Sequence, residues 1–569
     1  MKTNKKLWIL MIALVGVVFV GLLTTFLIAE NHKKNEIMGQ LNHTLTISAA
    51  QINDSQSINV SWDVDKIIDS LKIEVYHHET HVSTVIINDK TIIMKGIYAI
   101  DAFYGKQTIK VTSYNSFDKY TVTQTKTVGC NLWTNKYIIA PLPATMAVTM
   151  FTLSLEDITD NYTTPTFVWF KRSGVWDYKH MPENVKLIPV LESSHFIHET
   201  SERIIYKKLS RWVGELYEIN PSSTFDFYIN DIYGYGWMEA TYGNNIPVEN
   251  YHVTLLSDGL GSFDHFNNNF DNENAETRYN EMKAIYDDVK NGLKTNIDYV
   301  RENPELLSSR LRQYAYLMVK EEVNVEWWLT RVSKTMANNN SEVYSDLENL
   351  ISQNKIKVVN FNTILSTYDE QEKNELKQLF NFNSDVFENA INQNKKVMIF
   401  LGTWDQDETY FDQYIEILSK LYSDEFVIYY KGHPYSPTTT IQGKMEKLES
   451  MGLVDINSTI PAELLFFFNP DAYASGYTSS TFLSISDEKS VSIVHVRMGD
   501  FNQSYKSNID NFISKVETTD ETYGSLVTSQ NCYVIEYNNN VNYDIAIYDM
   551  STQEIVYYKS NGTVYEEVN

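Results

Sequence analysis

The sequence predicts an α/β protein in which two Rossmann-like domains face a cleft, preceded by an all-β sandwich and an N-terminal transmembrane helix. Three observations lead to this prediction. Short alternating strands fill residues 43–128, apolar strands alternate with amphipathic helical stretches from Tyr137 onward, and an uncharged apolar run lies near the N-terminus. Strands that alternate with helices are typical of parallel sheets covered by helices.

Composition excludes several classes of protein. The 569 residues are 43% hydrophobic and 21% charged, which is an ordinary globular balance. The 47 Lys and Arg against 73 Asp and Glu leave a net charge of −26, which argues against a general nucleic-acid binder. Cys130 and Cys532 are the only cysteines, so this chain cannot supply a four-cysteine zinc site or a disulfide-rich scaffold.

The apolar run Leu7–Ile28 is about long enough to cross a bilayer as a helix. Lysines precede it, which favours a cytoplasmic N-terminus and an exported remainder. A cleaved signal peptide is the competing interpretation, although Leu27-Ile28-Ala29 is a poor cleavage site. We therefore expect residues 1–35 to be a single-helix membrane anchor or signal, with the side of the membrane open.

Residues 40–129 are expected to form an immunoglobulin-like or fibronectin-III-like sandwich. Period-two alternation marks four strands, and a Trp in an early strand and a Tyr in the next fit such a module. His77, His78 and His81 could be interpreted as a metal cluster. Because adjacent strand residues point to opposite faces, we favour a solvated turn. The four strands are Ser57–Val64, Leu71–Tyr76, Gln107–Tyr114 and Tyr120–Val128.

The remaining chain divides into two β/α sets and a tail. Residues 135–385 form the first Rossmann-like domain, with strands at Phe167–Phe170, Phe225–Ile229 and Val253–Leu256 and a helical insert that includes Pro304–Val332. Residues 386–535 form the second, and residues 536–569 a β-hairpin tail. The strands of the second domain are predicted at Val397–Leu401, Phe426–Tyr430 and Ser492–Val496.

Three motifs at strand ends could carry chemistry. Asp258-Gly259 ends an apolar strand, where open α/β sheets bind ligands, although Asp-Gly is also an ordinary turn. Lys431-Gly-His-Pro434 offers a cation and a titratable donor suited to a phosphate leaving group, with a plain loop as the alternative. Thr478-Ser-Ser-Thr-Phe482 is a small-residue turn that could cradle a phosphate, or again a plain loop. It lacks the Walker arrangement.

Taken in order, these motifs resemble those of the bacterial multifunctional sialyltransferases, glycosyltransferase family 80. The resemblance covers about residues 135–535 and implies a GT-B type fold. Ser257 departs from the first acid of the family's Asp-Asp-Gly. The matching pieces are Phe167-Val-Trp-Phe-Lys-Arg172, Phe227-Tyr-Ile-Asn230, Leu256-Ser-Asp-Gly259, Phe400-Leu-Gly-Thr-Trp404, Tyr430-Lys-Gly-His-Pro434, Ile460-Pro-Ala-Glu-Leu-Leu465 and Thr478-Ser-Ser-Thr-Phe482.

The resemblance implies a role for each matching residue. Asp258 would be the general base on the acceptor hydroxyl, and His433 would hydrogen-bond or protonate the departing CMP phosphate. Glu463 would hold the cytidine ribose, and Trp404 would be a mobile aromatic near the acceptor. The phosphate would be bound by Ser479 and Ser480, the nucleotide pocket shaped by Lys431, Gly432, Pro434 and Gly402, and polar contacts made by Arg172 and Asn230.

The resemblance implies an inverting, metal-independent transferase that moves sialic acid from CMP-sialic acid to a galactose-terminated glycan. No metal or other cofactor is expected, because hydroxyls, backbone amides and a His can stabilise a departing monophosphate. We read Asp405-Gln-Asp407, the nearest metal-site lookalike, as a solvated loop. The alternatives are a related CMP-keto-sugar or polysialyl transferase, and an inactive glycan-binding surface protein. If the domain is exported, Cys130 and Cys532 could pair.

Overall fold

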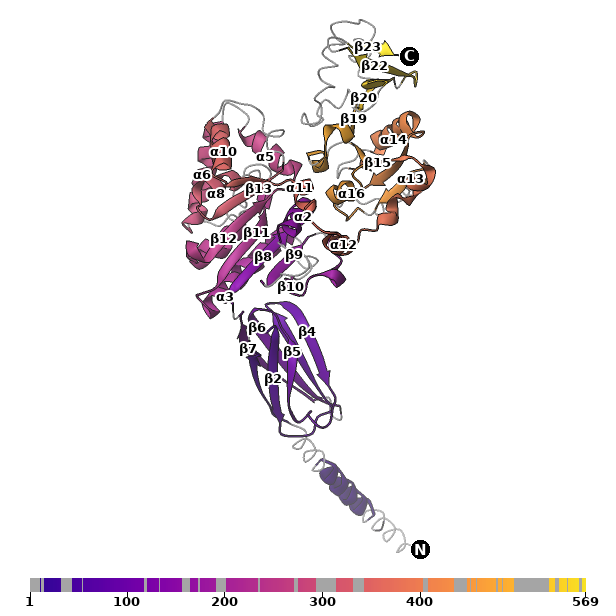
Figure 1. The fold of residues 1–569 in the computed structure, drawn as a ribbon. Coiled ribbons are helices and arrows are strands. Elements are labelled where there is room, and N and C mark those ends of the chain that lie inside the picture. The colour runs from indigo at the N-terminus through magenta and orange to yellow at the C-terminus, as the bar shows by residue number, and fades with distance from the viewer. Residues whose placement is uncertain are drawn as a thin grey trace. The chain divides into compact units, whose positions relative to one another are not determined.

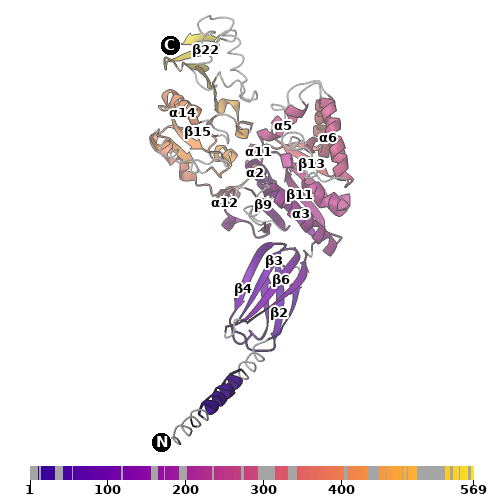
Figure 2. The same ribbon diagram turned by 180° about the vertical axis from the view of Figure 1, so that it is seen from behind.

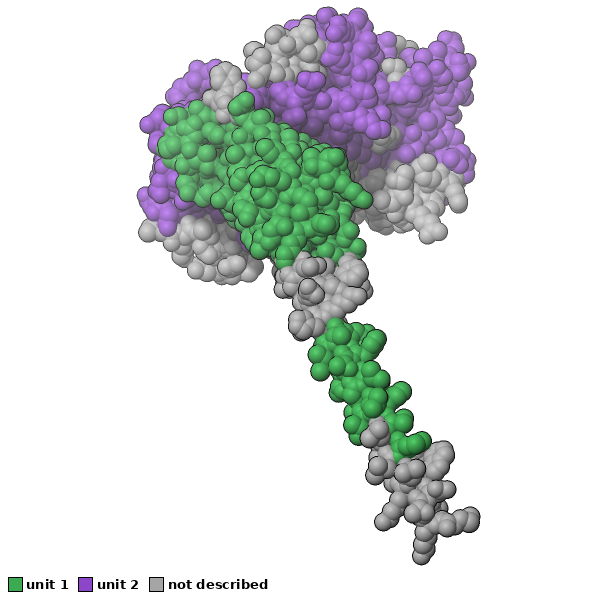
Figure 3. All heavy atoms as spheres, turned by 90° about the horizontal axis from the view of Figure 1, so that it is seen from below, with its two compact units in different colours: residues 1–135, 189–192, 211–223 green, residues 136–188, 193–210, 224–569 purple. Residues whose placement is uncertain are grey.

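The computed structural model describes most of the chain. It covers residues 11, 15–31, 43–53, 55–116, 120–132, 134–155, 164–171, 174–190, 201–233, 236–270, 275–292, 314–330, 342–402, 408–433, 448–450, 452–456, 458–476, 479–483, 485–495, 532–537, 542–549, 551–561 and 565–568. The chain divides into two compact units, coloured separately in Figure 3. Unit 1 contains residues 1–135, 189–192 and 211–223, and unit 2 contains the others.

The predicted membrane anchor is wrong. Within the described part of the chain, no helix combines the length and the apolar character that a membrane span requires. The localisation that we expected for Leu7–Ile28 therefore has no support.

Unit 1 contains two antiparallel sheets at the position of the predicted sandwich (Figure 1). One sheet has the order β1-β2-β5 and the other β4-β3-β6-β7. In β2 the residues Ile58, Val60, Trp62 and Val64 are buried and their neighbours are not, because a strand presents alternate residues to opposite faces. The strands are β1 Leu45–Gln51, β2 Ser57–Val64, β3 Ser70–His77, β4 Thr80–Ile87, β5 Lys95–Asp101, β6 Gly105–Asn115 and β7 Tyr120–Cys130.

The predicted solvated turn at the histidines is wrong for two of the three. His81 is exposed, but His77 is fully buried and the His78 side chain is 3% exposed. Strand alternation stops at His78, whose φ is +57°. Its ring therefore lies over that of His77, with centroids 4.2 Å apart. The ring of His78 is hydrogen-bonded to Glu215 of helix α3 (Ser201–Ile219).

Cys130 is also buried in unit 1. It is a free thiol, and burial raises its pKa to about 12. The expected pairing with Cys532 is therefore not seen, and the side chain of Cys532 lies outside the described residues. A thiol with so high a pKa is unreactive at neutral pH.

The first sheet of unit 2 is parallel throughout, as expected for a Rossmann-like domain. Its order is β10-β9-β8-β11-β12-β13-β14. Its strands are β8 Lys136–Leu142, β9 Thr166–Phe170, β10 Val185–Leu187, β11 Thr224–Asn230, β12 Tyr251–Leu256, β13 Val325–Leu329 and β14 Ile356–Val358. The helices around it include α2 Thr145–Ser154, α4 Gly236–Thr241, α5 Leu260–Phe270, α6 Ala275–Lys290, α8 Tyr314–Glu321, α10 Glu342–Ser352, α11 Phe361–Leu365 and α12 Glu370–Leu379.

One strand of this sheet was predicted as helix. The expected helical stretch Pro304–Val332 contains β13, which pairs with β12 and β14. Val325, Trp327 and Leu329 are buried while Glu326 and Trp328 are partly exposed, which is a period of two. Only five residues carry this pattern, too few to stand out beside the helical residues before them.

The second sheet of unit 2 has the order β17-β16-β15-β18-β19-β20-β21-β22-β23, parallel as far as β19 and antiparallel beyond it. The predicted tail hairpin is β21–β22, and it continues this sheet (Figure 2). The strands are β15 Lys396–Leu401, β16 Phe426–Lys431, β17 Val454–Ile456, β18 Tyr473–Gly476, β19 Ser490–His495, β20 Cys532–Tyr537, β21 Ile545–Asp549, β22 Ile555–Ser560 and β23 Tyr565–Val568. The helices are α13 Glu388–Gln393, α14 Glu408–Tyr422 and α16 Ala462–Phe468.

The two sheets of unit 2 share part of their core. Leu464 of α16 belongs to the same buried cluster as Leu256 of β12 and Met146 of α2. This shared cluster brings the carboxyl ends of β12, β15 and β16 to one region. In parallel sheets that edge is where ligands bind.

Candidate functional site

Asp258 follows β12 and is held by hydrogen bonds on both sides. Its Oδ1 accepts from Asn230 Nδ2 at 3.0 Å. Its backbone N–H donates to Asp231 Oδ1 at 3.0 Å and to Ser262 Oγ at 2.8 Å. A Cβ at Gly261 would lie 2.7 Å from Asp258 Oδ2. The carboxylate therefore has a fixed orientation that depends on a glycine in the first turn of α5.

Asp231 lies directly behind Asp258 and was not predicted. It is 2% exposed, and its Oδ2 accepts from Trp327 Nε1 at 2.9 Å. Burial raises the pKa of Asp231 to about 7, and the charge of Asp258 adds to this, while hydrogen bonds from Ser262, Trp327 and the Asp258 backbone oppose it. Asp231 thus joins the carboxyl end of β12 to the buried core through hydrogen bonds.

The Lys431-Gly432-His433 turn ends β16, and its lysine is buried. Lys431 is 5% exposed, and its Nζ donates to the Ser458 carbonyl at 3.0 Å. The Gly402 N–H donates to the Lys431 carbonyl at 2.9 Å, which fixes the ends of β15 and β16 together. His433 is half-buried. We expected Lys431 to project as a cation, but its ammonium is used to hold the turn that presents His433.

Glu463, Thr481 and Ser479 form a chain of hydrogen bonds. Thr481 Oγ1 donates to Glu463 Oε1 at 2.9 Å, and Ser479 Oγ donates to Thr481 Oγ1 at 3.0 Å. Glu463 is 7% exposed, and burial raises its pKa, against the effect of the Thr481 hydrogen bond and the charge of Lys431. The acid therefore anchors the small-residue turn after β18.

These groups line one pocket within unit 2. It is open to solvent at its mouth, and the space of about 640 Å³ that it spans includes some of that solvent. Its lining combines the first turn of α2, the end of β12 and the ends of β15 and β16. The lining residues are Ala144, Thr145, Met146, Asp258, Leu401, Gly402, Lys431, Gly432, His433, Pro461, Ala462, Glu463, Ser479 and Thr481.

Most of the predicted site residues that the structure describes meet in this pocket. Asn230 contacts Asp258 from a fully buried position. Arg172, Trp404 and Pro434 lie outside the described residues, as does the side chain of Ser480. The pocket is lined by the predicted residues Asp258, Gly402, Lys431, Gly432, His433, Glu463 and Ser479.

Sequence reasoning missed Thr145 and Thr481 in the lining and Asp231 behind it. Thr145 begins α2 directly after β8, and a strand-to-helix junction at the carboxyl edge of a parallel sheet is a signal that could have found it. Thr481 lies inside a predicted motif, where only the serines were assigned a role. Asp231 follows Asn230, but nothing in the sequence marks an acid as buried.

Similarity to known proteins is found among solved structures. No protein-family model matches the chain, and no curated protein matches it. Among solved structures it is similar to a sialyltransferase from Photobacterium damsela, at 13% identity and TM-score 0.46 over 78% of this chain and 90% of that one.

Two further solved structures show a comparable degree of similarity to this chain. The α/β-galactoside α-2,3-sialyltransferase of Photobacterium phosphoreum has 15% identity and TM-score 0.46, over 62% of this chain and 88% of that one. The 2,6-sialyltransferase of Photobacterium sp. JT-ISH-224, solved with CMP and lactose, has 15% identity and TM-score 0.47, over 79% and 86%. Structural similarity at such low sequence identity does not identify an activity. The function is therefore argued from the residues of the pocket.

Proposed function

We propose that this chain is an inverting sialyltransferase that moves sialic acid from CMP-sialic acid to a galactose-terminated glycan, without a metal in the transfer step. One observation carries the proposal. The carboxylate of Asp258 and the Lys431-Gly432-His433 turn, which come from different sheets, line the same pocket. A group transfer that needs a base at one end and leaving-group stabilisation at the other requires that arrangement. The seven motifs in family order support the choice of donor.

Asp258 is proposed to take the proton of the acceptor hydroxyl. The acceptor oxygen then forms a bond to the anomeric carbon of the sugar, and the bond from that carbon to the phosphate oxygen breaks. With attack from the side opposite to CMP, the anomeric configuration inverts. Asn230 donates to Asp258 Oδ1 and so helps to orient the proposed base.

The electron pair of the broken bond goes to the phosphate of CMP, and the turns of the second sheet are proposed to stabilise it. His433 would donate a hydrogen bond or a proton to that phosphate. Ser479 would donate a hydrogen bond to the phosphate by turning its hydroxyl away from Thr481, to which it donates in the structure. Because CMP leaves with one phosphate, such donors can stabilise it without a bound cation.

Glu463 and Gly432 are proposed to hold the cytidine part of the donor. The resemblance assigns the ribose to Glu463, which Thr481 orients through a hydrogen bond to one carboxylate oxygen. Lys431 and Pro434 would shape this end of the pocket, and Gly402 its wall. Trp404 and Arg172 would contact the sugars.

The proposal is tested by a transfer assay with the full-length protein. CMP-sialic acid and lactose are supplied in the presence of EDTA, and CMP and sialyl-lactose are followed by mass spectrometry. We expect both products to form in EDTA. Release of CMP without sialyl-lactose would support the donor site and refute lactose as an acceptor. Neither product from folded protein would overturn the proposal.

The role of Asp258 is tested by Asp258→Asn. We expect transfer to fall by about 10²–10⁴-fold, because a general base acts mainly in the transition state. CMP binding, measured by calorimetry, should remain within about threefold, since the donor groups lie on other strands. Asp424→Asn, at an exposed aspartate, is the matched control and should leave both unchanged. Normal turnover in Asp258→Asn would refute the assignment.

A further inference from the structure

A tight hairpin in unit 1 carries a histidine where a glycine is normally found. His77 pairs with Thr80, so the loop between β3 and β4 has two residues. His78 is the first of them and has a φ of +57°, whereas Glu79 is not among the described residues at positive φ. In two-residue hairpins, the first position takes glycine when it alone is left-handed. The chain therefore accepts backbone strain at a position that presents an imidazole.

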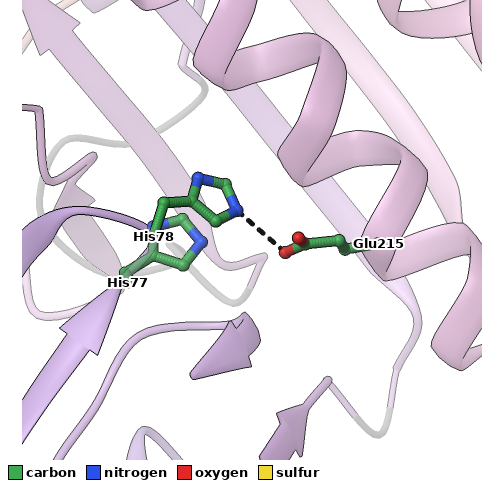
Figure 4. Close-up of side chains that lie close together, drawn as sticks. All are labelled: His77, His78 and Glu215. Atoms are coloured by element: carbon green, nitrogen blue, oxygen red, sulfur yellow. Dashed lines mark hydrogen bonds and ion pairs between the residues drawn. The ribbon is translucent and has the colours of Figure 1, made fainter. Parts of the chain in front are cut away.

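The strained residue places two imidazole rings beside one carboxylate. His77 and His78 are stacked with an interplanar angle of 25°, and His78 Nε2 lies 3.0 Å from Glu215 Oε2. Figure 4 shows both rings on the side that faces Glu215 of α3. One nitrogen of each ring and one carboxylate oxygen all lie within 4.8 Å of one another.

We propose that His77, His78 and Glu215 form a binding site for a divalent transition-metal ion of the Zn²⁺ type. Two imidazole nitrogens and one carboxylate oxygen are a common ligand set for zinc, with water in the fourth position. Calcium and magnesium are poorer candidates, because they select oxygen ligands. The three residues belong to unit 1, so the site joins the β3–β4 hairpin to the second half of α3.

The distances permit this with small side-chain movements. In a tetrahedral zinc site the ligand atoms lie about 3.4 Å apart, given Zn–N and Zn–O bonds of about 2 Å. His78 and Glu215 are already closer than that. His77 would have to approach by up to about 1.4 Å, which a change in the ring torsions can supply.

The surroundings of Glu215 fit an outer shell around a metal ligand. The Lys106 backbone N–H donates to Glu215 Oε2 at 3.1 Å and orients the carboxylate. The Arg211 guanidinium lies 3.3 Å from Oε1 and would repel a cation. However, Arg211 is 55% exposed and also contacts Glu79, so it can turn toward Glu79 and solvent when an ion binds.

The competing explanation is that His78 and Glu215 form only an ion pair that fastens the hairpin. A Zn²⁺ titration followed by calorimetry distinguishes this explanation from a metal site. The tag-free full-length protein is first treated with EDTA and dialysed. We expect saturable Zn²⁺ binding. His78→Asn and Glu215→Gln should each lower the Zn²⁺ affinity of one binding component at least tenfold. Asn tolerates the left-handed backbone, so His78→Asn keeps the hairpin. His81→Gln, at the exposed histidine nearby, is the control and should bind as the original chain does.

Substituting Co²⁺ for Zn²⁺ gives a second readout. A four-coordinate site should give intense visible d–d absorption that is lost in Glu215→Gln and kept in His81→Gln. Absence of saturable Zn²⁺ binding, or equal binding by the original chain and by His78→Asn, would overturn the proposal and leave the ion pair as the explanation. These readouts do not use transfer activity, so they are independent of the proposed function.

Discussion

Asp231 couples the stability of this protein to pH. Its pKa is raised from 3.8 to about 7, chiefly by burial. The native state therefore holds this proton more tightly than the unfolded chain does. Between about pH 4 and pH 7 the native state binds more protons, so stability falls as pH rises through that window. A pKa that differs by one between the native and unfolded states corresponds to about 1.4 kcal/mol of stability.

We predict that Asp231→Asn removes this dependence. Relative to the original chain, the variant should gain thermal stability as pH is raised from about 4.5 to about 8, because Asn does not ionise. The measurement is the difference in melting temperature between the two proteins at both pH values. Asp424→Asn is the control, and its difference should not vary with pH. A constant difference for Asp231→Asn would contradict the raised pKa.

The first turn of α5 controls the orientation of the proposed base. Gly261 is its second residue, and a Cβ there would press on Asp258 Oδ2. Because the Asp258 backbone is held by Asp231 and Ser262, we expect the carboxylate to yield by turning away from Asn230. A hydrogen bond to a charged group contributes about 1.5–3 kcal/mol.

We predict that Gly261→Ala lowers transfer by roughly ten- to hundredfold. The melting temperature should fall slightly, because the roughly 1 kcal/mol by which Ala favours a helix over Gly only partly offsets the loss of the hydrogen bond from Asn230 to Asp258. Turnover and thermal melting are measured on the same samples. Gly243→Ala, at a site with nothing within 4 Å of the added Cβ, should change neither. Full activity in Gly261→Ala would mean that Asp258 does not need its present orientation.

Unit 1 is completed by a segment far along the chain. Residues 211–223 belong to it, and Trp212 of this segment is fully buried. Its Nε1 donates to the Tyr104 carbonyl at 2.7 Å, and its ring lies 5.2 Å from that of Phe103. The β-sandwich therefore depends on residues that follow the first strands of the parallel sheet in sequence.

We predict that Trp212→Ala destabilises unit 1 by about 3–5 kcal/mol. The expected result is faster amide hydrogen exchange in β3 and β6, measured by mass spectrometry. Trp176→Ala, which removes a buried tryptophan of unit 2, should accelerate exchange around α2 and leave β3 and β6 unchanged. Unchanged exchange of β3 and β6 in Trp212→Ala would show that the sandwich is stable without this segment.

Local patterns were enough to find most strands and the pocket motifs. Strand positions followed from period-two or continuous apolar runs, and Asp258 and Lys431 from motifs at strand ends. Glu463 followed only from the resemblance to the sialyltransferase family. β13 was missed because five residues carry little periodicity. The membrane anchor was wrong, since among the described residues no helix has both the length and the apolar character of a membrane span.

The sequence by itself determined the parallel sheets, the order of the motifs and the residue types available for transfer chemistry. The tertiary structure decided which of them meet, because only packing of α16 with α2 and β12 brings both strand edges to one pocket. It also decided that Asp231 is buried and that Lys431 holds a turn instead of projecting. Burial, and hydrogen bonds between residues far apart in the sequence, arise from contacts that no local pattern encodes. The bond between His78 and Glu215, which are 137 residues apart, is an example.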